Sequence, residues 1–382
     1  MFTHQSAESP QNCAIIAEPD ETWAHLPPDL DLRTYKMIET LEIKNFRCFQ
    51  DIELNDLQAV NIVVGRNGSG KTALLEAIYF TLGTPALHFK MRQWRGLGSS
   101  VRYNDVIESR NGLWRDLFYE FDQSNAVSIA FRGSLNVTRK VRISTGPSKF
   151  ERVSDSSTVR DLPPITFEYY RKERRIGLVK PIYGDTNVEL PNAPQPLKGA
   201  FFASSTTIDQ NEAAIAFSTL QRKRKADEVI GQMCSVFPNL KGLSIAFNDS
   251  NPMVFANIDG EPELQPLGLA SYGVTKLFAY LVAIATQENG VVIIDELENG
   301  FYYKKLPEIW RSLYEVAESN GVQLFVSTHS KECLDAALPI VSQHRERFSM
   351  LRSEKDAGKP GVVRHFTGDG LVNALEIGID PR

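Results

Sequence analysis

Several classes of protein are excluded by what this sequence lacks. Its 382 residues include only four cysteines, which are Cys13, Cys48, Cys234 and Cys333. They lie far apart and show neither C-x-x-C spacing nor a Cys/His ligand pattern, so neither a disulfide framework nor a zinc site is expected. The N-terminus has no basic region followed by an apolar core, which argues against a secretion signal. We therefore expect reduced thiols and a cytoplasmic location.

Long apolar runs, excess positive charge and heptad repeats are missing as well. The longest apolar run, Leu277–Ala285, is less than half of the roughly 20 residues that a membrane-spanning helix needs, so no membrane partner is expected. The formal net charge is −5, so any contact with nucleic acid would have to come from local basic patches. Because no heptad pattern is sustained, a long coiled coil is excluded.

The strongest chemical signal is a glycine-rich segment that follows a short apolar strand, Ile62–Val64. It matches the P-loop pattern G-x-x-x-x-G-K-[ST] with Gly65, Arg66, Asn67, Gly68, Ser69, Gly70, Lys71 and Thr72. The glycines let backbone N–H groups approach phosphate oxygens, and the start of the predicted helix Thr72–Leu82 adds a positive dipole end. We expect Lys71 to reach the β- and γ-phosphates of ATP and the Thr72 hydroxyl to be a ligand of Mg²⁺.

Two adjacent acids follow another apolar run, Val291–Ile294, which is typical of a strand buried on both faces. Asp295 is expected to hold Mg²⁺, directly or through water, and Glu296 to polarise the water that attacks the γ-phosphate. Two acids at a strand end are costly unless a cation or solvent meets them. For an Asp-Glu pair on its own, the alternative is an ordinary solvated strand end.

A histidine occupies the corresponding place after the next apolar run, Val322–Val326. At a strand end, His329 would hydrogen-bond the γ-phosphate or the attacking water. A lone histidine is more often structural, but the position of His329 after the strand that carries Asp295 favours a functional role.

Strands and helices alternate in the C-terminal third, where helices are predicted at Val274–Thr286 and Leu306–Ser319. This order favours an α/β fold with a mostly parallel sheet flanked by helices. Ligands of such sheets bind beyond the carboxyl ends of the strands. The P-loop, Asp295 and His329 are therefore expected to meet at one edge of the sheet.

The sequence divides into three predicted regions. Residues 1–36 are rich in proline and polar residues, which predicts a mobile N-terminal extension or an arm that docks on a partner. Residues 37–85 and 265–382 are expected to form the core. Residues 86–264 are expected to form an inserted α+β lobe. Its predicted elements are strands at Val127–Phe131 and Leu135–Ile143 and a helix at Asn211–Val236.

As a set, these motifs resemble those of ABC-type ATPases. The P-loop, the Asp295-Glu296 pair and His329 are similar to the Walker A motif, the Walker B motif and the switch histidine. The opening run Leu41–Arg47 is similar to the start of the RecF, SMC and OLD branch. The run Asp295–Phe301 resembles the D-E-x-E-x-G-L-H motif of that branch, and Phe301 and Tyr302 depart from it at the end. The resemblance implies an ABC-type ATPase head that hydrolyses ATP with Mg²⁺.

The resemblance also implies how two copies would meet. Ser271 and Gly273 occupy the place of the signature motif, which in this family contacts the γ-phosphate held by the opposite protomer. Only a Ser-x-Gly core of Leu-Ser-Gly-Gly remains, and a plain loop before a helix is the alternative. Asn299 and Gly300 would match the loop that crosses the dimer interface. A homodimer or a higher homo-oligomer around ATP is expected.

The output of such an ATPase is left open by the sequence. OLD-type proteins carry a nuclease module after the ATPase, and the residues after His329 are too few for one. Short members such as the PtuA-like ATPases act beside a separate effector in defence against phage, so a separate nuclease or toxin is the expected partner. The alternative is a DNA-repair ATPase of the RecF type that binds DNA through the basic clusters Arg171–Arg175 or Arg222–Lys225. A transporter ATPase fits least, because the signature is weak and the insertion is long.

Overall fold

The computed structural model describes residues 35–86, 91–92, 114–146, 165–183, 188–204, 210–248 and 251–377. Residues 1–34, the greater part of the predicted N-terminal extension, lie outside these ranges. Tyr35 and Lys36 belong to the folded chain: Tyr35 is buried, and the Lys36 N–H donates to the Ser134 hydroxyl at 3.1 Å. No helix among the described residues combines the length and apolarity needed to cross a membrane.

A six-stranded sheet in the order β10-β14-β15-β3-β16-β17 forms the centre of the molecule, and only β17 runs antiparallel to its neighbour. The predicted α/β fold with a mostly parallel sheet is therefore confirmed. The strands are β3 (Val60–Val64), β10 (Gly199–Phe202), β14 (Val291–Ile294), β15 (Gln323–Thr328), β16 (Phe348–Glu354) and β17 (Val362–Thr367).

The register of this sheet brings several strand ends together. Val64 pairs with Thr328 and with Arg352, and Ile294 pairs with Val326. The residues that follow β3, β14 and β15 therefore lie at one edge of the sheet, as the alternation of strands and helices predicted. Every residue of β3, β14 and β15 is buried, because both faces of the sheet are covered.

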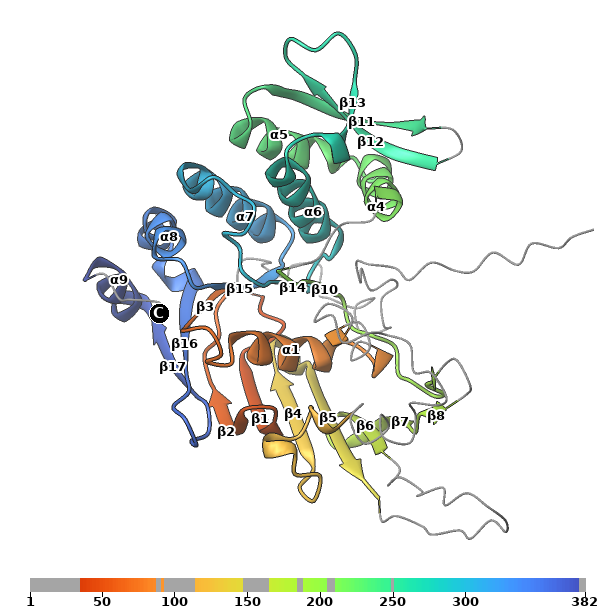
Figure 1. Ribbon diagram of the computed structural model, residues 1–382, viewed down its shortest axis with the longest axis vertical. Helices are drawn as coiled ribbons and strands as arrows, with labels where there is room; N and C mark the ends of the chain where they lie inside the picture. The colour runs from red at the N-terminus through yellow and green to blue at the C-terminus, as the bar shows by residue number, and fades with distance from the viewer. Residues whose placement is uncertain are drawn as a thin grey trace, which may run out of the picture.

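Helix α1 (Lys71–Leu82) lies between the parallel sheet and a second, antiparallel sheet in the order β2-β1-β4-β5-β6-β7 (Figure 1). All but one of its residues are buried, which explains why the helix is apolar all round. The strands of the second sheet are β1 (Thr40–Phe46), β2 (Phe49–Leu54), β4 (Val127–Arg132), β5 (Thr138–Thr145), β6 (Ile165–Arg171) and β7 (Arg174–Val179).

The opposite face of the parallel sheet is covered by helices, and alternating strand residues divide the core in two. Val63 and Phe325 point to the α1 side, whereas Ile62 and Val326 point to the helical side. The covering helices are α6 (Tyr272–Thr286), α7 (Leu306–Ser319), α8 (Lys331–Gln343) and α9 (Gly368–Glu376). Helix α6 is the longest helix of the described ranges, which agrees with the absence of a long coiled coil.

The described strands between residues 86 and 264 do not form the separate inserted lobe that was predicted. Strand β4 pairs with β1 and β10 pairs with β14, so residues 127–202 supply strands to both main sheets. The sequence did not indicate this, because each pairing joins strands far apart in the chain.

A smaller upper layer stacks on α6 and α7 (Figure 1). It consists of α4 (Gln210–Arg222), α5 (Ala226–Val236), β11 (Leu240–Asn248), β12 (Asn251–Ile258) and β13 (Gln265–Pro266), and a short pair, β8 (Ile182–Tyr183) and β9 (Val188–Glu189), lies elsewhere.

Two element predictions in this region were wrong. The helix predicted at Asn211–Val236 is broken into α4 and α5, because the chain reverses at Arg224, whose φ is +57°. The break separates a run of four like charges and lets the Lys225 ammonium reach the Glu288 carboxylate at 2.9 Å. The strand predicted at Leu135–Ile143 begins only at Thr138, since Leu135 lies in a turn with positive φ.

A buried glutamine ties the chain before β1 to the central sheet. The Gln323 side chain accepts a hydrogen bond from the Ile38 N–H at 2.9 Å and donates to the carbonyl oxygens of Ile38 and Gln58, both at 2.8 Å. Gln323 is 1% exposed. Its amide therefore satisfies the buried N–H and carbonyl oxygen of Ile38, and it adds a second donor to the Gln58 carbonyl, which also accepts from the Asn61 side chain.

We predict that Gln323→Ala lowers the free energy of unfolding by about 2–4 kcal/mol, because it leaves the buried N–H and carbonyl oxygen of Ile38 without that partner. Urea unfolding followed by circular dichroism measures this change. The control is Gln221→Ala on the exposed face of α4, which should change the stability by less than about 0.5 kcal/mol. Equal effects of the two substitutions would contradict the role given to Gln323.

Candidate functional site

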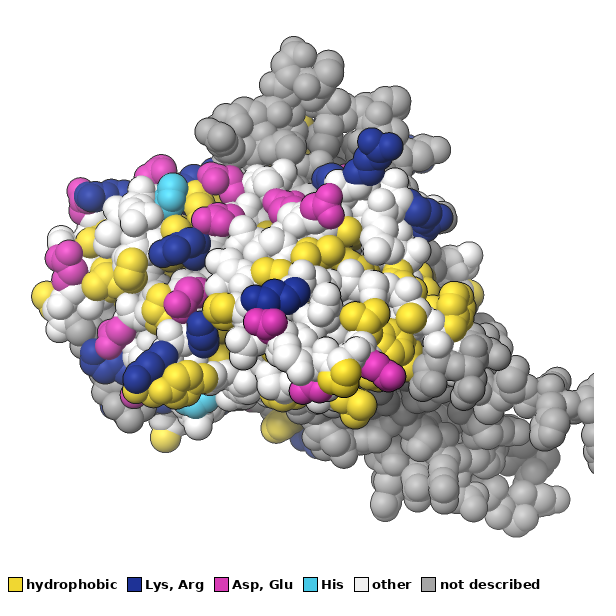
Figure 2. Space-filling model, turned by 90° about the horizontal axis from the view of Figure 1, so that it is seen from above, with side chains coloured by type: hydrophobic (Ala, Val, Ile, Leu, Met, Phe, Trp, Pro, Cys, Tyr) yellow, Lys and Arg dark blue, Asp and Glu magenta, His cyan; other side chains and the backbone are white. Residues whose placement is uncertain are grey.

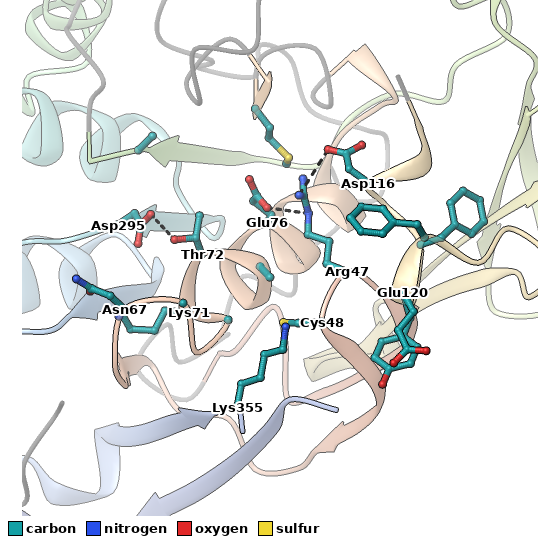
Figure 3. A pocket seen from close by; sticks show the side chains of 18 of the residues that line it. Arg47, Cys48, Asn67, Lys71, Thr72, Glu76, Asp116, Glu120, Asp295 and Lys355 are labelled. Carbon is teal, nitrogen blue, oxygen red and sulfur yellow. Dashed lines mark hydrogen bonds and ion pairs between the residues drawn. The ribbon is translucent and has the colours of Figure 1, made fainter. Parts of the chain in front are cut away.

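A cavity of about 880 Å³ opens above the P-loop, at the edge of the sheet where β3 and β14 end (Figure 3). Asn67, Gly68, Gly70, Lys71 and Thr72 line it from the P-loop, and Asp295 and Glu296 line it from the end of β14. Arg66 is exposed, while Gly65 and Ser69 are buried beneath the loop. A cavity of this size accommodates a nucleoside triphosphate.

Glycines shape the loop for two different physical reasons. Gly65, Gly68 and Gly70 all have positive φ, at +147°, +78° and +105°. A Cβ on Gly65 would lie 2.3 Å from the carbonyl oxygen of Ser353, whereas a Cβ on Gly68 would meet nothing within 4 Å. Gly65 is therefore required by the close approach of β16, and Gly68 by backbone conformation alone.

Lys71 lies at the start of α1 with its amine folded over the loop. The ammonium donates to the carbonyl oxygens of Gly65, at 2.7 Å, and Arg66, at 3.1 Å. Burial lowers the pKa of Lys71, and the negative charges of Asp295, Glu296 and Glu298 oppose that shift. The side chain thus places a positive charge at the loop whose backbone N–H groups face the cavity.

Asp295 is joined to two other segments by hydrogen bonds. Its carboxylate accepts from the Thr72 hydroxyl at 3.0 Å and from the Ser327 hydroxyl of β15. The Asp295 N–H donates to the carbonyl oxygen of Phe202 at 2.8 Å, which links β10 to the same point. Burial raises the pKa of Asp295, and the two hydroxyl donors partly offset that shift. The structure therefore brings together the two residues predicted as metal ligands.

These oxygen donors fit a magnesium ion. Mg²⁺ prefers oxygen ligands and is commonly bound by one or two protein groups together with substrate phosphates. A buried carboxylate whose pKa burial raises is an arrangement that a nearby cation stabilises. Asp295 and Thr72 are the residues that would hold it, directly or through water. Among the described residues, no group of three or more His, Cys, Asp or Glu side chains is placed to hold a metal ion.

Glu296 is held at the mouth of the site by backbone and side-chain contacts. Its φ is +56°, which turns the chain sharply after β14, and its N–H donates to the Ser327 hydroxyl at 2.9 Å. Its carboxylate accepts from the Asn299 side-chain amide at 2.7 Å. Asn299 is itself fixed, because its carbonyl oxygen accepts from the Lys276 ammonium at 2.8 Å.

Lys276 is a buried cation that the sequence did not single out. It is 3% exposed on α6, and burial lowers its pKa to about 8, while the charges of Glu298, Glu296 and Asp295 act in the opposite direction. The Lys276 ammonium lies over the aromatic rings of Tyr272 and Tyr280, in two cation–π contacts. The lysine therefore connects the start of α6 to the loop that positions Glu296.

His329 lies next to Glu296 and Glu298 and does not line the cavity. Its Nδ1 is 3.4 Å from a carboxylate oxygen of Glu296 and 3.2 Å from one of Glu298. The same Glu298 oxygen accepts from the backbone N–H groups of His329 and Ser330, at 2.9 and 3.1 Å. Glu298 thus fixes the turn that leads into α8, a role that the sequence did not assign to it.

Ser271 and Gly273 stand apart from the P-loop cavity. Ser271 is the N-cap of α6, and its hydroxyl accepts from the Val274 N–H at 3.4 Å. Gly273 packs against the loop after Glu296: a Cβ on it would lie 3.0 Å from the carbonyl oxygen of Gly300. Neither residue lines the cavity at the P-loop of the same chain.

The cavity extends beyond the P-loop toward the antiparallel sheet. At this end Arg47 forms an ion pair with Glu76 of α1 at 3.0 Å and lies 3.7 Å from Asp116 (Figure 3). Phe118, Tyr119 and Phe121 line the same end. The sequence placed Arg47 in a family-like run but gave no signal for the aromatic residues, which arrive from a distant segment.

Comparison with known proteins assigns this architecture. Residues 60–335 match the family model described as "AAA domain, putative AbiEii toxin, Type IV TA system". The chain belongs to this family. It is an ATPase of the ABC type, in agreement with the predicted resemblance, and both the Walker A and Walker B segments fall within the matched range.

Curated relatives and solved structures agree with the assignment. The chain is 23% identical to the ATP/GTP phosphatase of Helicobacter pylori, over 89% of this chain and 98% of that protein. It is 23% identical to the OLD nuclease of Thermus scotoductus, over 86% of this chain and 67% of the nuclease. The Smc head domain of Pyrococcus furiosus superimposes with a TM-score of 0.51 at 12% identity, over 89% of this chain and 98% of that domain, which shows a shared fold.

We predict different effects for alanine at the two P-loop glycines. Gly65→Ala should lower the free energy of unfolding by about 3 kcal/mol or more, because its Cβ meets the backbone of β16. Gly68→Ala should cost only about 1 kcal/mol, from its left-handed conformation. Urea unfolding without nucleotide measures both. A larger loss for Gly68→Ala would contradict the packing of β16 on the loop.

Proposed function

We propose that this ATPase is a dimeric switch that closes around ATP and controls a separate effector in anti-phage defence. The observation that carries the proposal is the convergence of Lys71, Thr72, Asp295 and Glu296 on one cavity. The family description names a toxin and a toxin-antitoxin system, which supports a defence role. The described strands after His329 belong to the parallel sheet of the ATPase, and the described α-helices after it cover one face of that sheet.

Each residue at the cavity has a distinct role in hydrolysis. The P-loop N–H groups and Lys71 hold the β- and γ-phosphates, and Thr72 and Asp295 hold Mg²⁺, which neutralises charge on the phosphates when bound. Glu296 orients and polarises the attacking water, and the Asn299 amide, at 2.7 Å, keeps its carboxylate in place. His329 does not line the cavity, but its Nδ1 lies 3.4 Å from the Glu296 carboxylate, where it would assist that base.

The position of the signature residues supports the proposed dimer. Ser271 is exposed at the N-terminal end of α6, Gly273 is buried in the first turn, and neither lines the cavity of its own chain. The start of a helix binds anions through free N–H groups and its dipole. A second copy facing this end would place its γ-phosphate there. Because Lys276 links α6 to Asn299, closure of the dimer also acts on the loop that holds Glu296.

We predict that Lys71→Ala and Glu296→Gln fail at different steps. Lys71→Ala should weaken ATP binding by roughly 100-fold, because it removes a charge-assisted phosphate contact. Glu296→Gln should bind ATP normally, slow hydrolysis by about 10²–10³-fold and accumulate as an ATP-bound dimer. Calorimetry, phosphate release and light scattering measure these effects, with Asp335→Asn on the exposed side of α8 as the control. Unchanged turnover in Glu296→Gln would refute the assigned base.

A second candidate function is DNA binding, and one surface favours it. The β6–β7 turn exposes Arg171, Lys172 and Arg174 together, whereas Lys223 and Lys225 of the other basic cluster form ion pairs with Glu288. On the face that Figure 2 shows, however, the described basic side chains are interspersed with acidic ones. That face, on the side of the upper layer, therefore has no continuous track for a phosphate backbone.

Duplex DNA separates the two candidates. For an effector-controlling switch we expect DNA to leave the ATPase rate unchanged and the product of the neighbouring gene to co-purify with the chain. Stimulation by DNA that is lost when Arg171, Lys172 and Arg174 are all replaced by alanine would instead establish the second function. Lys241→Ala, which removes a lysine paired with Asp259 in the upper layer, is the control and should keep any stimulation.

A further inference from the structure

The β16–β17 hairpin is anchored directly on the P-loop. The Ser353 hydroxyl of β16 donates to the carbonyl oxygen of Ser69 at 2.7 Å, and the carbonyl oxygen of Ser353 approaches Gly65 too closely for a side chain there. On the other side of the turn, the Gly361 N–H donates to the carbonyl oxygen of Cys48 at 2.9 Å. The base of the hairpin is therefore fixed relative to the phosphate-binding loop.

The turn of this hairpin carries a lysine into the nucleotide cavity. Lys355, Gly358 and Lys359 line the cavity, and Figure 3 shows the Lys355 amine next to Cys48, on the side away from Asp295. Burial raises the pKa of the Cys48 thiol, and the charge of Lys355 is the largest influence that opposes this shift. The ammonium is thus close to Cys48, beside Gly70 of the P-loop.

The two acids that flank Lys355 in the sequence are already paired with other cations. Glu354, the neighbour of Lys355, forms ion pairs with Arg352 at 3.0 Å and with Arg364 at 3.1 Å. Asp356 pairs with Lys359 at 3.3 Å. Lys355 itself has no hydrogen bond or ion pair among the described residues. No described acid therefore neutralises its charge through an ion pair.

Resting on the proposed nucleotide site, we propose that Lys355 is a nucleotide-binding residue that contacts the phosphate chain on its α-phosphate side. Asp295 and Thr72 fix the γ-phosphate end of the cavity, so the side near Cys48 receives the phosphate closest to the sugar. A lysine acts on phosphate as a point charge, and this one is delivered by a turn whose base is bonded to the P-loop. The C-terminal hairpin therefore forms part of the binding site as well as the edge of the sheet.

Calorimetry of Lys355→Ala with ADP and with a non-hydrolysable ATP analogue tests the assignment. We expect about a fivefold loss of affinity for both nucleotides, because an exposed charge contact to the α-phosphate is shared by the two. Lys355→Arg should restore most of the affinity. The loss should shrink at high ionic strength, where salt screens exposed charges.

The controls separate this inference from the proposed function. Lys241→Ala removes the same charge in the upper layer and should leave both affinities unchanged, and unfolding midpoints verify that each variant is folded. An unchanged affinity in Lys355→Ala, or a loss confined to the triphosphate, would overturn the assignment, provided that Lys71→Ala shows its expected loss of nucleotide affinity. If Lys71→Ala also binds normally, the nucleotide site itself is wrong.

Discussion

The arrangement of this site depends on the hydrogen-bonded group that Thr72, Asp295 and Ser327 form at the ends of three neighbouring strands. Each residue comes from a different part of the chain, and the parallel register of β14, β15 and β3 brings them together. A buried carboxylate is costly without donors, and these two hydroxyl groups supply them. The same contacts leave Asp295 beside the P-loop, where a phosphate-bound cation would lie.

The loop after β14 connects this centre to the rest of the molecule. Glu296 turns away from the strand with positive φ, and the following residues fold back so that Asn299 holds its carboxylate. Lys276 then joins this loop to α6, whose first turn carries Ser271. Two hydrogen bonds therefore connect α6 to Glu296, and in the proposed dimer they would couple the two copies.

Dense packing around α1 explains why the P-loop is well defined. The helix is enclosed by two sheets, and the loop before it is in direct contact with β16. Such enclosure fixes the first turn of α1 and its N–H groups before any ligand arrives. Because the loop is already ordered, phosphate binding loses less conformational entropy than it would with a flexible loop.

Local patterns were enough to predict much of the site. The residues 65–72, the apolar strands before Asp295 and His329, and the parallel sheet follow from spacing and periodicity, because a strand buried on both faces and a glycine turn have distinctive sequences. Local patterns did not predict the helix break at Arg224, because the ion pair of Lys225 with Glu288 joins residues that are distant in the chain.

By itself, the sequence determined the chemistry: a phosphate-binding turn, an acidic pair and a histidine, each placed after an apolar strand. Only the tertiary structure decided which other groups surround them. Strand pairings placed residues 127–202 in both sheets, buried Lys276 beside the acids and brought Lys355 over the P-loop. The physical reason is that these contacts join segments far apart in the chain, where no local period or motif records which partners will meet.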